Sequence, residues 1–172
     1  IPGQVRGRID ETAQMALRLD AAIAEVPLPN GQRSDVFARA ERAAWEETGE
    51  AYRPALLADV PLIPAHTALL TTTVYHGSNP PGIVDIVPSE SPRPAGWTAA
   101  LVIVDGLIGQ AVDDGICQRF SHVPGMPELL LRAVSYRRHV NDLHSASRSN
   151  TRSHIERVEQ HLVSRASAIL ER

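Results

Sequence analysis

Residues 137–144, "RRHVNDLH", hold the side chains with the clearest potential for chemistry. Arg138 carries a permanent positive charge, and His144, six residues later, can exchange protons near neutral pH. One interpretation is that these two residues form a catalytic pair. The other is that the segment is the solvated face of a helix, on which Arg138 and Asp142 form an ion pair that contributes roughly a few tenths of a kcal/mol.

The stretch from Arg138 to His144 resembles the motif of HEPN-type ribonucleases, in which an Arg and a polar residue precede a His. The resemblance implies a small helical bundle that acts as a dimer without a metal. It also implies that Arg138 binds the scissile phosphate, that His139 fills the polar position and that His144 performs acid–base chemistry on the RNA 2′-hydroxyl. The likeness covers seven residues, and the same rule matches Arg148 to His154.

Metal and cofactor chemistry find little support in the sequence. Five potential ligands near the C-terminal end lack the HExxH, ExxH and HxxxH spacings of helical metal sites. They are His139, Asp142, His144, His154 and His161. The stretch "DGLIGQAVDDG" lacks both the GxGxxG spacing and a P-loop lysine. We therefore expect no metal and no cofactor, and we expect Cys117 to be a buried core residue.

A small-ligand site is a further hypothesis. Its candidate residues are His66 and Tyr75, within the proline-rich part of the chain, and Trp97, which follows it. If the chain is a ligand-sensing helical bundle, these three residues are the candidate ligand-binding residues. An aromatic wall with a few polar groups is typical of small-molecule pockets.

The charge of the chain is uneven. All 17 basic residues are Arg, which indicates a high-GC genome, bacterial or phage. The formal net charge is −3, but residues 132–172 contain eight Arg against four acids, whereas residues 1–131 contain nine Arg against 16 acids. We expect the basic part to pair with the acidic body of the same fold or of a second copy. The Arg-rich C-terminal helices are also a candidate surface for nucleic acid.

Composition favours a helical core. Hydrophobic residues make up 43% of the 172 residues and aromatic residues only 4%, so the core must consist mainly of Ala, Leu, Val and Ile. No stretch reaches the roughly 18 uninterrupted apolar residues of a membrane span. The single cysteine excludes an intrachain disulfide and fits a reducing compartment, so we expect a cytoplasmic protein without a membrane span.

Two helices are predicted near the N-terminus. Residues 4–26 place apolar side chains at steps of three and four. A second helix begins at Ser34 as its N-cap and ends before Pro54, with Phe37 and Ala40 on its inner side. Because only a short loop joins the two helices, we expect them to pack against each other in antiparallel orientation.

The C-terminal end, residues 127–172, is predicted to form a basic helical hairpin. Pro127 is typical of the first turn of a helix, and "HSASRSN" interrupts the pattern. After the interruption, Ile155, Val158 and Leu162 recur at steps of three and four, which indicates a last amphipathic helix.

Residues 54–96 contain eight prolines and are predicted to be irregular. Within them, "TALLTTTVYHG" suits a short helix or a strand, because Thr and Val are β-branched.

Residues 97–122 allow two interpretations. As a helix over 97–119, the stretch is apolar on most sides and would be central, with Gly106 and Gly109 permitting close contact between helices. As strands, Asp105-Gly106 and Asp114-Gly115 would be hairpin turns. Each glycine would cost a helix about 1 kcal/mol. The lack of alternation in "AALVIV" favours the helix.

We therefore predict a mostly α protein, with residues 1–172 forming a single-domain bundle around a central apolar helix at 97–119. The alternative is an α+β domain with a small antiparallel sheet in 67–122. For function, the sequence favours a non-enzymatic interaction or regulatory domain that self-associates or docks a protein partner. The alternatives are the HEPN-like ribonuclease using Arg138 and His144, and the ligand-sensing bundle.

Overall fold

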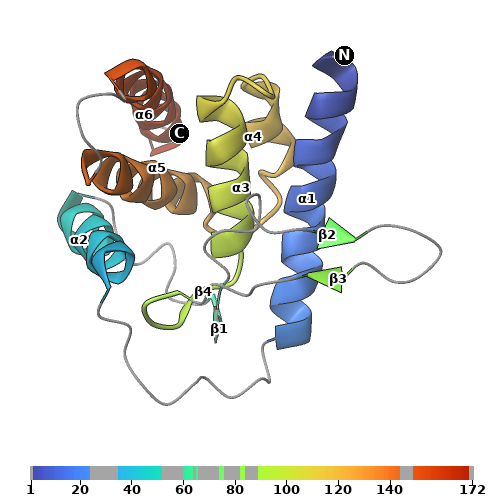
Figure 1. The fold of residues 1–172 in the computed structure, drawn as a ribbon, viewed down its shortest axis with the longest axis horizontal. Helices are drawn as coiled ribbons and strands as arrows, with labels where there is room; N and C mark the ends of the chain where they lie inside the picture. Colours follow the sequence, from blue (N-terminus) through green and yellow to red (C-terminus); the bar gives the residue numbers. More distant parts are fainter. Residues whose placement is uncertain are drawn as a thin grey trace.

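The computed structural model describes residues 2–23, 35–51, 60–63, 65, 74–75, 82–83, 89–143 and 149–170. Within these ranges the chain is mostly helical, as predicted (Figure 1). The helices are α1 (Pro2–Ile23), α2 (Val36–Ala51), α3 (Trp97–Ile108), α4 (Gly115–Arg119), α5 (Met126–Asp142) and α6 (Ser149–Leu170). The strands are β1 (Leu62–Ile63), β2 (Val74–Tyr75), β3 (Gly82–Ile83) and β4 (Arg93–Pro94).

Helix α3 is the centre of the bundle. In Figure 1 it stands between α1 on one side and α5 and α6 on the other. Ten of its 12 residues are buried, among them every residue from Trp97 to Val104. A helix that is apolar on all sides is stable only when neighbours cover it on all sides. The prediction of a central apolar helix is therefore confirmed.

Gly106 allows α1 and α3 to approach each other closely. A Cβ atom at this position would lie 2.8 Å from Cγ2 of Ile9 on α1, which is closer than side chains normally pack. The predicted role of Gly106 in close helix contact is confirmed. Gly109 has a different role, because it is the exposed C-cap residue of α3.

The predicted helix over 97–119 is divided in two. Helix α3 ends at Ile108, and Gln110 takes up a left-handed conformation with φ of 55°. The chain then turns, and the side chain of Asp113 accepts a hydrogen bond from the N–H of Gly115 at 3.0 Å, where α4 begins. Asp114 and Gly115 thus form the start of helix α4 and not a hairpin turn. Aspartate side chains favour such turns because they bond to their own backbone.

Two short antiparallel strand pairs lie in the proline-rich part of the chain. Leu62 pairs with Pro94 in β1 and β4, and Val74 pairs with Ile83 in β2 and β3. The pair of β2 and β3 lies within residues 67–122, where the alternative prediction placed an antiparallel sheet, whereas β1 lies outside that range and residues 97–108 are helical.

The N-terminal helices do not form the predicted antiparallel pair. Among the described residues, α1 packs on α3, whereas α2 packs on α5. A short connection limits the distance between two helix ends, but burial of the apolar faces decides which helices meet.

The inner side of α2 also differs from the prediction. Ala40 is buried, but Phe37 is 43% exposed and Glu41 is 1% exposed. The N-cap role falls to Asp35, whose Oδ1 accepts a hydrogen bond from Ala38 N at 2.9 Å. The predicted inner face is therefore buried at Ala40 but not at Phe37, and the buried Glu41 has an arginine partner, described below.

Candidate functional site

Arg138, the first member of the predicted catalytic pair, is engaged in ion pairs with neighbouring helices. Its Nη2 donates to Glu47 Oε1 on α2 at 2.6 Å, and its Nε lies 3.6 Å from Glu159 Oε2 on α6. His139 Nε2 lies 2.7 Å from Glu47 Oε2. His144 is outside the described residues, so its pairing with Arg138 stays a prediction.

Glu47 is the shared partner of Arg138 and His139. Burial alone would raise the pKa of the Glu47 carboxyl, but the hydrogen bonds from His139 and Arg138 outweigh it and hold the pKa below its usual value. This carboxylate therefore stays ionised and holds the guanidinium in place. The arrangement connects α2, α5 and α6 through charge.

Other arginines of the basic C-terminal part also bond within the chain. Arg137 on α5 makes two hydrogen bonds to Asp105 on α3, at 2.7 and 2.8 Å. Arg157 on α6 donates to the carbonyl oxygen of Leu107 at 3.2 Å, close to the C-terminus of α3, where a cation is favoured. These pairs agree with the expectation that the basic part pairs with the acidic body of the same fold.

The ring of Trp45 on α2 lies between two guanidinium groups. Cζ of Arg93 is 4.5 Å from the ring centroid, and Cζ of Arg132 is 4.3 Å from it. Glu41 Oε1 accepts a hydrogen bond from Arg93 Nε at 2.9 Å. Glu128 Oε1 accepts one from Arg132 Nη2 at 2.9 Å. This cluster, the Trp45 stack, joins α2 to β4 and α5 with all its charges paired.

Of the three residues predicted to bind a ligand, the structure describes the side chain of Trp97 alone, so their meeting in one site stays a prediction. Trp97 is fully buried and makes an edge contact with Trp45, with 5.2 Å between ring centroids. Trp97 also contacts the ring of Tyr136 at 6.3 Å. Tyr75 lies in β2, and His66 is outside the described residues. Trp97 is thus part of the core and lines neither of the two pockets described next.

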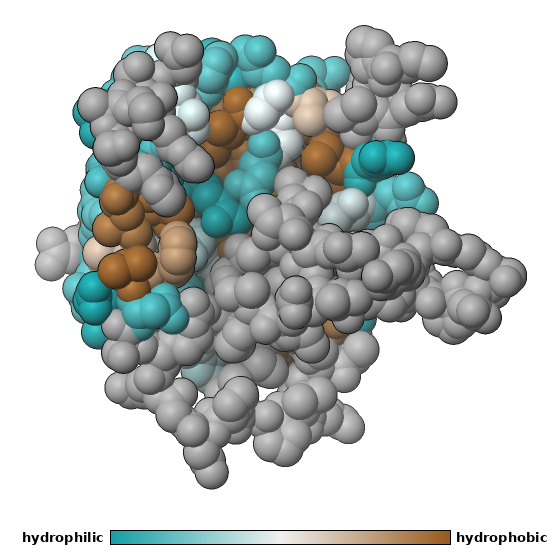
Figure 2. Space-filling model, in the orientation of Figure 1, coloured by the Kyte–Doolittle hydropathy of each residue, from teal (hydrophilic) through white to brown (hydrophobic). Residues whose placement is uncertain are grey.

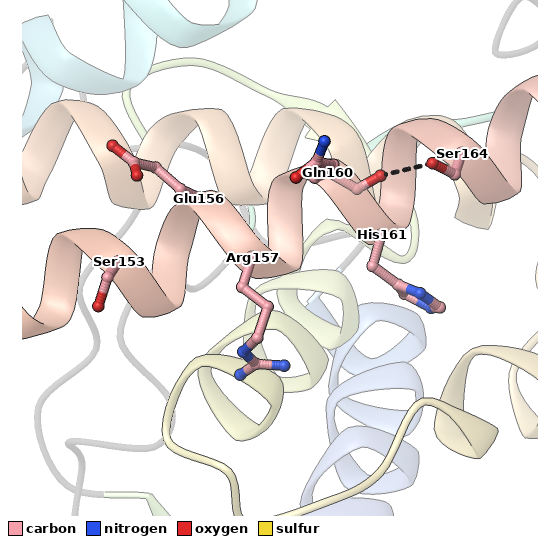
Figure 3. Close-up of a pocket in the computed structure, with 6 residues that line it drawn as sticks. All are labelled: Ser153, Glu156, Arg157, Gln160, His161 and Ser164. Atoms are coloured by element: carbon pink, nitrogen blue, oxygen red, sulfur yellow. Dashed lines mark hydrogen bonds between the residues drawn. The ribbon is translucent and has the colours of Figure 1, made fainter.

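One pocket, of about 420 Å³, lies along α6 (Figure 3). It is lined by Ser153, Glu156, Arg157, Gln160, His161 and Ser164. Figure 3 shows Arg157 and His161 pointing toward the α3–α4 segment, where His161 Nδ1 is 3.6 Å from Asp114 Oδ2. A groove lined by one helix encloses little of a small molecule, so this pocket is the weaker candidate.

A second pocket, of about 470 Å³, lies where α1, β1 and the start of α3 meet. Its walls are mostly aliphatic and include Leu17, Ala21, Pro61, Ile63, Val123 and Pro124. Two ionisable residues, Asp20 and His122, also line it. We call it the Asp20 pocket. A mainly apolar cavity with a few polar groups is the usual form of a small-molecule site, and its volume is within the usual range.

Asp20 is the unusual group in this pocket. Its side chain is only 5% exposed, and its Oδ2 accepts a hydrogen bond from the N–H of Gly96 at 2.8 Å. Gly96 precedes α3 and has φ of 100°, a conformation that suits glycine. The carboxylate thus caps the central helix from α1, at the end where the helix dipole favours a negative charge.

The second oxygen of Asp20 is unsatisfied. Oδ1 is buried and has no hydrogen-bond partner among the described residues. Burial raises the pKa of the Asp20 carboxyl to about 6, and the Gly96 N–H offsets part of that rise. A buried polar atom without a partner calls for an explanation such as a water, an ion or a ligand.

Sequence reasoning missed Asp20, although a signal was present. Asp20 follows Ala16 by four positions and Ala13 by seven, so it falls on the buried face of α1. A charged residue on the apolar stripe of an amphipathic helix indicates a buried role.

The described residues contain no group of three or more His, Cys, Asp or Glu side chains that could hold a metal ion. Cys117 is buried, and burial raises the pKa of its thiol above the usual value. In the same part of the chain, no helix is both long and apolar enough to cross a membrane.

Comparison of the chain with protein-family models, with curated proteins and with solved structures gives no match. The class of this protein therefore comes from its own geometry: a helical bundle with an apolar pocket beside a buried carboxylate.

Proposed function

We propose that this chain is a non-enzymatic regulatory domain that binds a small, mainly apolar ligand in the Asp20 pocket. The observation that carries the proposal is that Asp20, whose buried Oδ1 has no hydrogen-bond partner among the described residues, lines an otherwise mainly aliphatic pocket. The pocket lies at the start of α3, the helix around which the bundle is built. A ligand there contacts α1, β1 and the segment after α4 at once, so its binding changes the stability of the whole bundle.

The test is a thermal-stability screen with small apolar compounds. A ligand that binds only the folded state, at 100 times its Kd, stabilises that state by about 2.7 kcal/mol. For a domain of this size, that corresponds to a rise in Tm of about 5–10 °C. Ala21 lines the pocket and is exposed on α1, so Ala21→Leu should fill the pocket without disturbing the core. The ligand-induced rise in Tm should be absent in this variant. A rise that persists would mean that the ligand binds elsewhere.

Docking of a protein partner, or self-association, is the second candidate function. Val36 and Phe37, at the first turn of α2, are each 43% exposed. Figure 2 shows hydrophobic side chains gathered over α2 on the face that it displays. Exposed apolar residues that lie together are typical of contact surfaces. We propose a second copy of this chain as the occupant of this surface.

Light scattering over a range of protein concentrations tests self-association. The mass of the wild type should rise toward that of a dimer, and the mass of a Phe37→Ser variant should stay that of a monomer. A wild type that is monomeric at all concentrations removes this candidate and leaves the Asp20 pocket untouched.

A further inference from the structure

Asp20 differs from the other buried acidic residues in its surroundings. Among the described residues, Glu41 and Glu128 are the other two buried carboxylates, and each is within 2.9 Å of an arginine nitrogen. Asp20 accepts one bond from a neutral backbone N–H, and no cation contributes to its pKa. Of these three carboxylates, Asp20 is therefore the one without a counter-ion among the described residues.

Among the described residues, the surroundings of Asp20 also offer no cation of fixed charge. The walls of the pocket are aliphatic, and His122, which stacks on Phe120, is its other ionisable residue. Arg18, two positions before Asp20 on α1, is exposed, and the first turn of α3 carries no charged side chain. An apolar environment strengthens the attraction between a buried anion and a cation that enters it.

We propose that the Asp20 pocket takes a ligand with a protonated amine on an apolar body, whose N–H bonds to Oδ1 of Asp20. This inference rests on the proposed function and adds the chemical class of the ligand. The amine supplies both the missing hydrogen bond and the missing positive charge. Such charge-assisted bonds are roughly twice as strong as bonds between neutral groups. The apolar body of the ligand packs against the pocket walls at Leu17, Ile63 and Val123.

The pH dependence of binding gives a second readout. Because the pKa of Asp20 is about 6 in the ligand-free fold, the carboxylate is mostly ionised at neutral pH and becomes protonated below pH 6. An ammonium ligand that needs the ionised form should lose about tenfold in affinity for each pH unit below that value. Protonation of His122 would also repel a cation, so a His122→Gln variant must separate the two effects.

The experiment measures calorimetric affinities of two probes of the same length, hexylammonium and 1-hexanol. Wild type should bind hexylammonium more tightly than 1-hexanol at neutral pH, with the pH dependence described above. Asp20→Asn, which keeps an oxygen for Gly96, should weaken hexylammonium binding about tenfold or more and leave 1-hexanol unchanged. Glu11→Gln removes an exposed charge from the same helix and should change neither affinity. The pH dependence should persist in His122→Gln.

The outcomes distinguish the two proposals. Suppose that 1-hexanol binds as tightly as hexylammonium, and that neither affinity changes with pH or in Asp20→Asn. The pocket then binds ligands, but the proposal that the ligand is an amine is wrong. If neither probe binds, and no compound in the stability screen gives a rise in Tm that Ala21→Leu abolishes, both the amine proposal and the proposed function are wrong. Should Asp20→Asn not fold, the pH dependence of the wild type and of His122→Gln still decides the matter.

Discussion

Replacing Asp20 by asparagine is expected to change how the stability of the fold depends on pH. Burial raises the pKa of the Asp20 carboxyl from 3.8 to about 6, despite the hydrogen bond from Gly96. In the unfolded chain the same carboxyl is in water and has its ordinary pKa. Between pH 3.8 and 6 the folded state therefore binds more protons than the unfolded state. The free energy of unfolding falls as pH rises through this window and is level above it.

The size of this fall follows from the two pKa values. Each unit of pKa difference corresponds to about 1.4 kcal/mol, so ionisation of Asp20 costs the folded state about 3 kcal/mol. The Asp20→Asn variant has no charge to bury. Its stability minus that of the wild type should rise by about 3 kcal/mol from below pH 3.8 to above pH 6. The amide NH2 group that replaces Oδ1 in the variant does not titrate in this range, so it shifts the difference only by a constant at every pH.

Urea unfolding followed by far-ultraviolet circular dichroism, at a series of pH values, measures the difference. Subtraction of the two curves removes the contribution of every group that titrates alike in both proteins. For Glu11→Gln, an exposed substitution on α1, the difference in unfolding free energy from the wild type should not change with pH. A level difference for Asp20→Asn as well would mean that the carboxyl is hydrated in the folded state, and the argument for an unsatisfied buried charge would be refuted.

Three other substitutions test the remaining structure. Glu41→Gln should destabilise the fold by about 1.5–3 kcal/mol in urea unfolding, because the buried Arg93 loses one of its two carboxylate partners and keeps only Glu90. The double replacement of Glu41 and Arg93 by methionine should cost less. Gly106→Ala should cost about 1–3 kcal/mol by the same measurement, and less in an Ile9→Ala background, since the added methyl group meets Ile9. Arg138→Ala should cost less than about 1 kcal/mol, because its ion pairs are partly exposed. If the chain is a ribonuclease, this variant abolishes RNA cleavage; purified wild type that leaves RNA intact contradicts that function.

The helices could be predicted from the sequence because their signals are local. The apolar steps in α1, α5 and α6 and the unbroken run "AALVIV" in α3 each lie within one element. The division between α3 and α4 was missed because Asp113 and Asp114 suit both hairpin turns and helix starts. In the structure the Asp113 side chain bonds to Gly115 N.

The partner of each helix and the buried charges could not be predicted in the same way. Glu41 and Arg93 are 52 residues apart, and nothing local to either indicates that they meet. Their pairing joins α2 to β4, while α2 packs on α5 and Phe37 stays exposed. Asp20 was within reach of sequence reasoning through its position on the apolar stripe, but its bond to Gly96 spans 76 positions and depends on the full fold.

The Trp45 stack has a practical consequence for spectroscopy. The chain has two tryptophans, and their rings lie 5.2 Å apart in edge contact where α2, α3 and α5 meet. All indole fluorescence therefore originates at this one junction, under two positive guanidinium groups on Trp45. A change in emission reports separation of α2 from the bundle, so departure of that helix can be timed without an added dye.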